Sequence, residues 1–125
     1  MGKAIAVPAF HSSSTPEGTY AGCPCGYIFA IEGKAIYHAG DTCLNSEMKT
    51  IGDTYQPQIA MLPIGGYYTM DIEQAVLASK WLKANDIIPM HYNTFDAINV
   101  NIEDFERQIR ELGKLPIILK IGQSF

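Results

Sequence analysis

The chain has few charged residues, few cysteines and no long apolar runs. Charged side chains make up 18% of the 125 residues, and 9 Lys and Arg stand against 13 Asp and Glu. A surface that binds nucleic acid needs a basic footprint to displace counterions, so we expect no nucleic-acid partner. A membrane-spanning helix needs about 20 apolar residues in succession, and the sequence has no such run. We therefore expect no membrane partner either.

Three cysteines are an odd number, and they lack the spacing of a disulfide framework. Reduced thiols are typical of the cytoplasm, and the first ten residues do not form the pattern of a signal peptide. These features predict a cytoplasmic protein. At this length the chain is one domain, residues 1–125, and it can bury roughly two-thirds of its surface without disulfides or metals.

Short apolar runs alternate with segments of helical periodicity, which favours an α/β layer with helices packed on a sheet. Glu32 and Gly33 form a tight-turn signal between two apolar runs, so these runs are expected to pair as a hairpin and make the sheet mixed. Asp71 and Gln74 have the spacing of a capping box. The expected strands cover residues 3–10, 25–31, 34–39, 59–64, 86–90 and 116–121, and the expected helices cover 45–55, 71–84 and 102–112.

Two histidines and one aspartate follow three separate strands at the point where each strand ends. His11 follows the first strand, Asp41 the third and His91 the fifth. In α/β sheets this edge is where ligands bind, so parallel strands would bring the three side chains together. Two imidazoles and a carboxylate can form part of the shell of a borderline divalent metal such as Zn²⁺. Spacing alone leaves structural histidines as an equal alternative.

Four ordered motifs carry a resemblance that covers nearly the whole chain. They are AFHSS at residues 9–13, YHAGDT at 37–42, LPIGG at 62–66 followed by Thr69 and Met70, and IPMHY at 88–92. This series resembles the metallo-β-lactamase superfamily and is most similar to its small metal-dependent hydrolases near the ascorbate-6-phosphate lactonase branch. The resemblance implies half of a four-layer αββα sandwich: a mixed β-sheet with helices on one face. The chain would be the C-terminal half of the hydrolase domain.

The resemblance also implies roles for these residues. His11 would be a ligand of a first metal, Asp41 a bridge between two metals, and His91 a ligand of the second. Asp41 and His91 would be the catalytic pair, and Thr42 would orient Asp41. A metal-bound hydroxide would attack an ester, a lactone or a phosphoester in a small-molecule substrate. The metal is expected to be Zn, with Mn or Fe as alternatives that suit the same ligands.

Three tyrosines are candidates for substrate contact. Tyr67 and Tyr68 follow two glycines in the loop before the best helix, and Tyr92 follows His91. The resemblance implies that these loops border the active site, while aromatic packing in the core is the competing interpretation. His38 is interpreted as a structural residue of its strand.

The superfamily's His-x-His-x-Asp-His motif, which supplies further metal ligands, is absent from this sequence. We therefore expect a truncated or incomplete domain that is inactive or binds metal weakly by itself. It should expose an apolar sheet face and form a homodimer, or assemble with a separate N-terminal half. The alternative function is that of a non-catalytic αβ half-domain that mediates self-association or assembly with such a partner.

Overall fold

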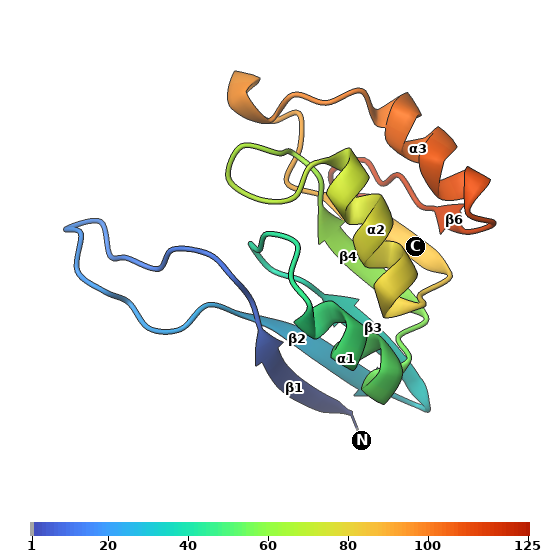
Figure 1. Ribbon diagram of the computed structural model, residues 1–125, viewed down its shortest axis with the longest axis horizontal. Helices are drawn as coiled ribbons and strands as arrows, with labels where there is room; N and C mark the ends of the chain where they lie inside the picture. The colour runs from blue at the N-terminus through green and yellow to red at the C-terminus, as the bar shows by residue number, and fades with distance from the viewer. Residues whose placement is uncertain (1) are drawn as a thin grey trace.

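The computed structural model describes residues 2–125 and contains one six-stranded sheet with three α-helices (Figure 1). The strands lie in the sheet in chain order, from β1 at one edge to β6 at the other. The strands are β1 (Lys3–Pro8), β2 (Cys25–Ile31), β3 (Lys34–His38), β4 (Ile59–Pro63), β5 (Asp86–Met90) and β6 (Leu115–Pro116). The helices are α1 (Glu47–Tyr55), α2 (Ile72–Leu82) and α3 (Ile102–Glu111), with a short 3₁₀-helix η1 (Asp96–Ile98) before α3.

The strand directions decide where the connecting loops meet. Strand β2 is antiparallel to both β1 and β3, whereas β3 to β6 pair in parallel. Strands β1, β3, β4 and β5 therefore all end at the same edge of the sheet, which we call the site edge. The turn between β2 and β3 places Glu32 and Gly33 in the left-handed region, with φ of 51° and 78°, as a two-residue hairpin requires. The predicted mixed sheet and hairpin are confirmed.

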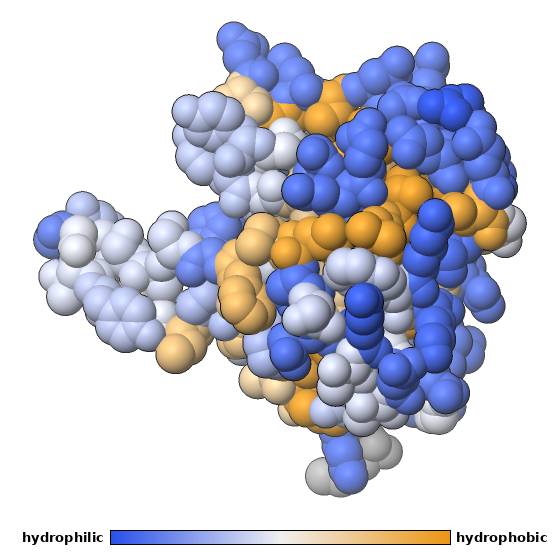
Figure 2. All heavy atoms as spheres, in the orientation of Figure 1, coloured by the Kyte–Doolittle hydropathy of each residue, from blue (hydrophilic) through white to orange (hydrophobic). Residues whose placement is uncertain are grey.

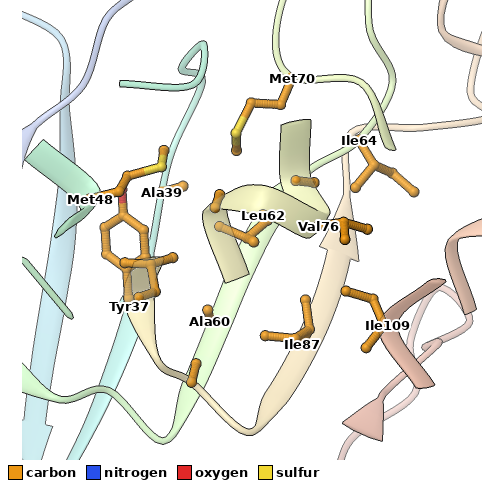
Figure 3. Close-up of a cluster of buried hydrophobic side chains, with 14 of the residues drawn as sticks. Tyr37, Ala39, Met48, Ala60, Leu62, Ile64, Met70, Val76, Ile87 and Ile109 are labelled. Atoms are coloured by element: carbon orange, nitrogen blue, oxygen red, sulfur yellow. The ribbon is translucent and has the colours of Figure 1, made fainter. Parts of the chain in front are cut away.

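All three helices cover one face of the sheet, and the core lies between the two layers. The strand register places Ile28, Tyr37, Ala60 and Ile87 side by side on this face, and each is at most 1% exposed. Helix side chains complete the cluster, as Figure 3 shows for Met48, Val76 and Ile109. The prediction of a mixed sheet with helices on one face is confirmed.

Helix α2 begins at the capping box that its sequence predicts. The Asp71 carboxylate accepts a hydrogen bond from the Gln74 N–H at 2.8 Å, and the Gln74 side chain accepts one from the Asp71 N–H at 3.3 Å. The predicted capping box is therefore present.

Gly52 lets α1 approach α2 closely, because a Cβ at this position would lie 2.2 Å from the Trp81 carbonyl oxygen.

The opposite face of the sheet carries no helix among the described residues, and we call it the open face. Alternation along the strands turns apolar side chains toward it. They are Tyr27, Phe29 and Ile31 on β2, Ile36 on β3, and Ile59 and Met61 on β4. Tyr27 is 41% exposed and Ile31 is 49% exposed. The apolar run of β4 indicated burial on both faces, but Ile59 and Met61 are only half-buried, so this expectation is wrong for the open face.

The last strand is much shorter than predicted. Only Leu115 and Pro116 pair with β5, and the Ile117 N–H adds one hydrogen bond to the Ile87 carbonyl at 2.9 Å. The next bond of a parallel ladder would need an N–H at Pro89, which proline lacks. The expected strand at 116–121 is therefore wrong beyond its first residue. No helix within residues 2–125 has the length and hydropathy needed to cross a membrane.

Candidate active site

The site edge holds a cavity of about 400 Å³, and the three candidate ligands line it together. His11 comes from the arm between β1 and β2 (residues 9–24), Asp41 from the loop after β3, and His91 from the loop after β5. Figure 2 shows the molecule hollowed on the side where this arm projects, between the arm and the loops that follow β4 and β5. The predicted convergence of these three residues on one rim is what the topology produces, because β1, β3 and β5 run in the same direction.

Asp41 and His91 are in direct contact. The Nδ1 atom of His91 lies 2.7 Å from a carboxylate oxygen of Asp41, and each side chain is about half exposed. His91 has a left-handed backbone with φ of 54°, which is uncommon for a residue other than glycine and is concentrated at functional sites. Gly65 makes room for it, because a Cβ at this position would lie 2.3 Å from the His91 carbonyl oxygen.

The hydrogen bonds of the other two histidines distinguish their roles. The Nδ1 of His11 lies 2.8 Å from the Ser12 carbonyl oxygen, so Nδ1 carries the proton and Nε2 keeps a free lone pair. This is the arrangement that a metal-binding imidazole needs. In His38 the Nδ1 accepts a hydrogen bond from the Gly40 N–H at 3.1 Å, so the proton of the neutral ring lies on Nε2. His38 is therefore unsuited to bind a metal through Nε2.

His38 nevertheless belongs to the electrostatic surroundings of the site. Partial burial lowers the pKa of His38, and the neighbouring His91 lowers it further. The hydrogen bond to its own backbone segment and the negative charge of Asp41 oppose this shift. The imidazole is therefore held neutral at pH 7, in keeping with its interpretation as a structural residue.

Thr42 connects two of the site loops. It is fully buried, and its hydroxyl accepts the Phe10 N–H at 3.0 Å and donates to the Cys43 carbonyl at 2.9 Å. The Cys43 N–H in turn donates to the Phe10 carbonyl at 3.0 Å. The hydrogen bonds of the described residues include none from Thr42 to the Asp41 carboxylate. Thr42 and Cys43 therefore fix the loop that carries Asp41 to the loop that carries His11.

The donors suit a divalent metal in kind, but they do not form a complete shell. Two imidazoles and a carboxylate are typical ligands of Zn²⁺ and similar ions, and the Nε2 of His11 is free to bind. Within residues 2–125, however, no three His, Cys, Asp or Glu side chains form a group that could hold a metal ion. The Asp41–His91 pair and the imidazole of His11 are thus two separate parts of a site.

The three candidate tyrosines have different surroundings in the structure. Tyr68 lines the cavity, whereas Tyr67 is 79% exposed and packs edge-on against Tyr68, with ring centroids 4.6 Å apart. Tyr92 packs against the core, and burial raises its pKa. Sequence reasoning missed other side chains that line the cavity, namely Thr69, Thr94, Phe95 and Ile98. The signal available for them was a large aromatic residue, Phe95, in a polar loop three residues after Tyr92.

Comparisons with known proteins show which family the chain resembles. Residues 3–91 match the family described as "Beta-lactamase superfamily domain". The chain is 45% identical over 128 residues to a "UPF0173 metal-dependent hydrolase" from Anoxybacillus flavithermus and 49% identical over 119 residues to one from Ignicoccus hospitalis. The alignments cover 99% and 94% of this chain but 56% and 49% of those proteins.

One solved structure is similar over almost the whole chain. It is Igni18, described as a novel metallo hydrolase from Ignicoccus hospitalis, with a TM-score of 0.89 and 42% sequence identity. The match covers 99% of this chain and 52% of that one. The chain therefore spans about half the length of the relatives that it matches.

Proposed function

Since the chain belongs to the β-lactamase superfamily domain family, we propose that it supplies part of the active site of a metal-dependent hydrolase. The substrate would be a small molecule with an ester, lactone or phosphoester bond. The main support for this proposal is the position of His11, Asp41 and His91 on the wall of one cavity. In the reaction, water adds to the acyl or phosphoryl centre, the bond to the leaving oxygen breaks, and that oxygen departs with a proton.

We propose that His11, Asp41 and His91 hold the metal, with Zn²⁺ preferred and Mn or Fe as alternatives. When bound, such an ion lowers the pKa of a coordinated water and stabilises developing negative charge on oxygen. The chain's own contribution is orientation. Asp41 fixes the His91 ring through their 2.7 Å contact, and the Ser12 carbonyl holds the His11 ring with Nε2 free. Asp41 and His91 would act as the catalytic pair.

The remaining ligands would come from outside this segment, either from a second copy or from a separate N-terminal half. Two observations support this part of the proposal: within residues 2–125 no three His, Cys, Asp or Glu side chains form a group that could hold a metal ion, and the matched relatives are about twice as long. The chain itself would bind metal weakly. Its three cysteine thiols are free, which supports a reducing compartment such as the cytoplasm.

Elemental analysis combined with native mass spectrometry tests metal binding. After dialysis against Zn²⁺, the purified chain should retain less than one tightly bound ion per chain. Asp41→Asn should reduce the retained metal further, because it removes a carboxylate from the cavity. Asp53→Asn is the matched control, since Asp53 is an exposed carboxylate paired with Lys83 on the helix layer. Two tightly held ions per chain would contradict the partial site.

Hydrolysis assays test the activity. The chain is assayed with 4-nitrophenyl acetate, a simple lactone and bis(4-nitrophenyl) phosphate, with added Zn²⁺ or Mn²⁺. We expect at most slow metal-dependent hydrolysis from this partial site, and we expect Asp41→Ala to abolish it and Asp53→Ala to preserve it. Equal rates for the wild type and Asp41→Ala would refute catalysis by this site.

The open face favours a second candidate function, which is self-association without catalysis. Its exposed apolar side chains, Tyr27 and Ile31 among them, are of the kind that marks an interface. The occupant we propose is a second copy of this chain. Lys34 and Asp86 border one depression on this face, so their opposite charges could pair across a two-fold axis.

Sedimentation equilibrium tests this assembly. A dimer is expected at micromolar concentration, and Phe29→Lys should shift the chain to monomer because it places a charge in the open face. Leu77→Lys, on the exposed side of α2, is the control and should leave the dimer intact. A stable monomer for the wild-type chain would refute self-association.

A further inference from the structure

The loops at the site edge contain no Lys or Arg. Its loops span residues 9–24, 39–46, 64–71 and 91–101, and they contain none of the chain's nine Lys and Arg. The same loops contain Glu17, Asp41, Asp71 and Asp96. Proteins recognise phosphate and carboxylate groups mainly with Arg, Lys and free helix N-termini. The side chains around this cavity provide no such cation.

The N-terminus of helix α2 is also closed to anions. Helix α2 starts directly after the loop that carries Tyr68 and Thr69, but the Asp71 carboxylate already accepts the Gln74 N–H at 2.8 Å. Glu73 adds a second negative charge in the first turn. An anionic substrate group would have to displace the chain's own carboxylate there, so this helix start is unsuited to bind phosphate.

Aromatic and apolar side chains form one wall of the cavity instead. The rings of Tyr68 and Phe95 both line it and lie 6.4 Å apart, and Tyr67 supports Tyr68 from outside with ring centroids 4.6 Å apart. Tyr68 is 57% exposed and Phe95 is 53% exposed, so a ligand can reach both rings. The buried residue Ile98 also lines the cavity and adds an apolar side chain to it.

We propose that the cavity accepts a substrate whose uncharged apolar or aromatic group packs against Tyr68 and Phe95, and that a phosphorylated group is rejected at this wall. This inference rests on the proposed function and narrows its substrate class to compounds with an uncharged apolar group next to the reacting bond. The substrate's apolar group would be removed from water by the two rings, which favours binding. Its carbonyl would lie on the polar side of the cavity, among the hydroxyls of Thr69 and Thr94 and the candidate ligands.

A phosphate group packed against the aromatic wall, away from the candidate ligands, would lose hydration without gaining an Arg or Lys partner. Burying an uncompensated charge is costly. The charge distribution of the four loops therefore selects against anions, while the aromatic wall selects for apolar groups. The two observations are independent and lead to the same substrate class.

Ligand-observed ¹⁹F NMR tests binding separately from hydrolysis. The probes are 4-fluorophenylacetamide, which is neutral and is not an ester, and 4-fluorobenzylphosphonate, which is an anion of similar shape. Each is titrated into the full chain with Zn²⁺ and again with a chelator. We expect the neutral probe to bind at least tenfold more tightly in the presence of the chelator, where no metal ion can attract the phosphonate. Phe95→Ala and Tyr68→Ala should each weaken its binding at least threefold.

Tyr20→Ala is the control, because Tyr20 is an exposed aromatic residue that is not among those that line the cavity. It should leave both affinities unchanged, and circular dichroism verifies that each variant folds. Asp41→Asn should preserve binding of the neutral probe even where it abolishes hydrolysis, so the two proposals can fail separately. In the presence of the chelator, equal or tighter binding of the phosphonate, binding of neither probe, or unchanged affinity in both aromatic variants would overturn the inference.

Discussion

Replacing Tyr37 with phenylalanine tests the energetics of a buried hydroxyl in the core. Tyr37 is 0% exposed, and within residues 2–125 its hydroxyl has no hydrogen-bond partner. Figure 3 shows the hydroxyl directed toward Met48. A buried polar group without a partner costs about 1–3 kcal/mol, whereas the small cavity that its removal leaves costs roughly 0.4 kcal/mol. We therefore expect Tyr37→Phe to stabilise the chain by about 1 kcal/mol at pH 7.

The same hydroxyl makes the stability of the wild type depend on pH. Burial raises the pKa of Tyr37 to about 12 from its usual 10.0. Between these values the unfolded chain loses the phenolic proton while the folded chain keeps it, so stability falls as pH rises. At pH 11 the two pKa values give a tenfold difference in ionisation, which corresponds to about 1.4 kcal/mol. Tyr37→Phe lacks this loss, so its advantage should grow to about 2.4 kcal/mol.

Urea denaturation followed by circular dichroism measures both quantities. Wild type and Tyr37→Phe are compared at pH 7 and at pH 11, because the difference between them cancels the titration of every other tyrosine and lysine. Tyr55→Phe is a useful control, since Tyr55 is only partly buried. A variant that is less stable than the wild type at pH 7, or an advantage that does not grow with pH, would refute the reasoning.

Three further substitutions test the helix layer. Asp71→Ala removes the side chain that caps α2 and should lower the free energy of unfolding by about 1 kcal/mol in urea titrations; Gln74→Ala removes only the reciprocal half of the capping box and should cost less. Gly52→Ala should destabilise the chain by roughly 2 kcal/mol despite the higher helix propensity of alanine, because the added methyl group would lie 2.2 Å from the Trp81 carbonyl oxygen. A shift in Trp81 fluorescence should accompany it, and an unchanged or raised thermal midpoint would contradict the close approach of α1 and α2.

Local patterns predict most of the fold because each element carries its own signal. Strands β2 and β5 begin and end where their apolar runs do, and the Asp71 cap sets the start of α2. The last strand could not be predicted from its own residues. Its length depends on Pro89 of the neighbouring strand, which cannot donate the next hydrogen bond. The half-exposure of β4 has a similar origin, since an apolar run does not reveal whether both faces of its sheet are covered.

The sequence likewise predicts one part of the candidate site and not the other. Strand direction brings His11, Asp41 and His91 to one cavity, and the position of a polar residue after each strand carries that information. The roles of these residues remain predictions, because the donors form only part of a metal shell. The contributions of Phe95 and Thr94 depend on how the loop after β5 folds back, which no local motif encodes.

The hydrogen bonds of Thr42 couple the movements of two loops of the site. One buried oxygen atom and one backbone amide join the segments of Phe10 and Cys43, so the loops that carry His11 and Asp41 are expected to shift as a single rigid piece. His91 stands on a different loop and touches that piece through one contact with a carboxylate. The cavity would then open or close through one movement of His91 relative to that piece, and this movement would break or restore the contact between the Asp41 carboxylate and the His91 imidazole.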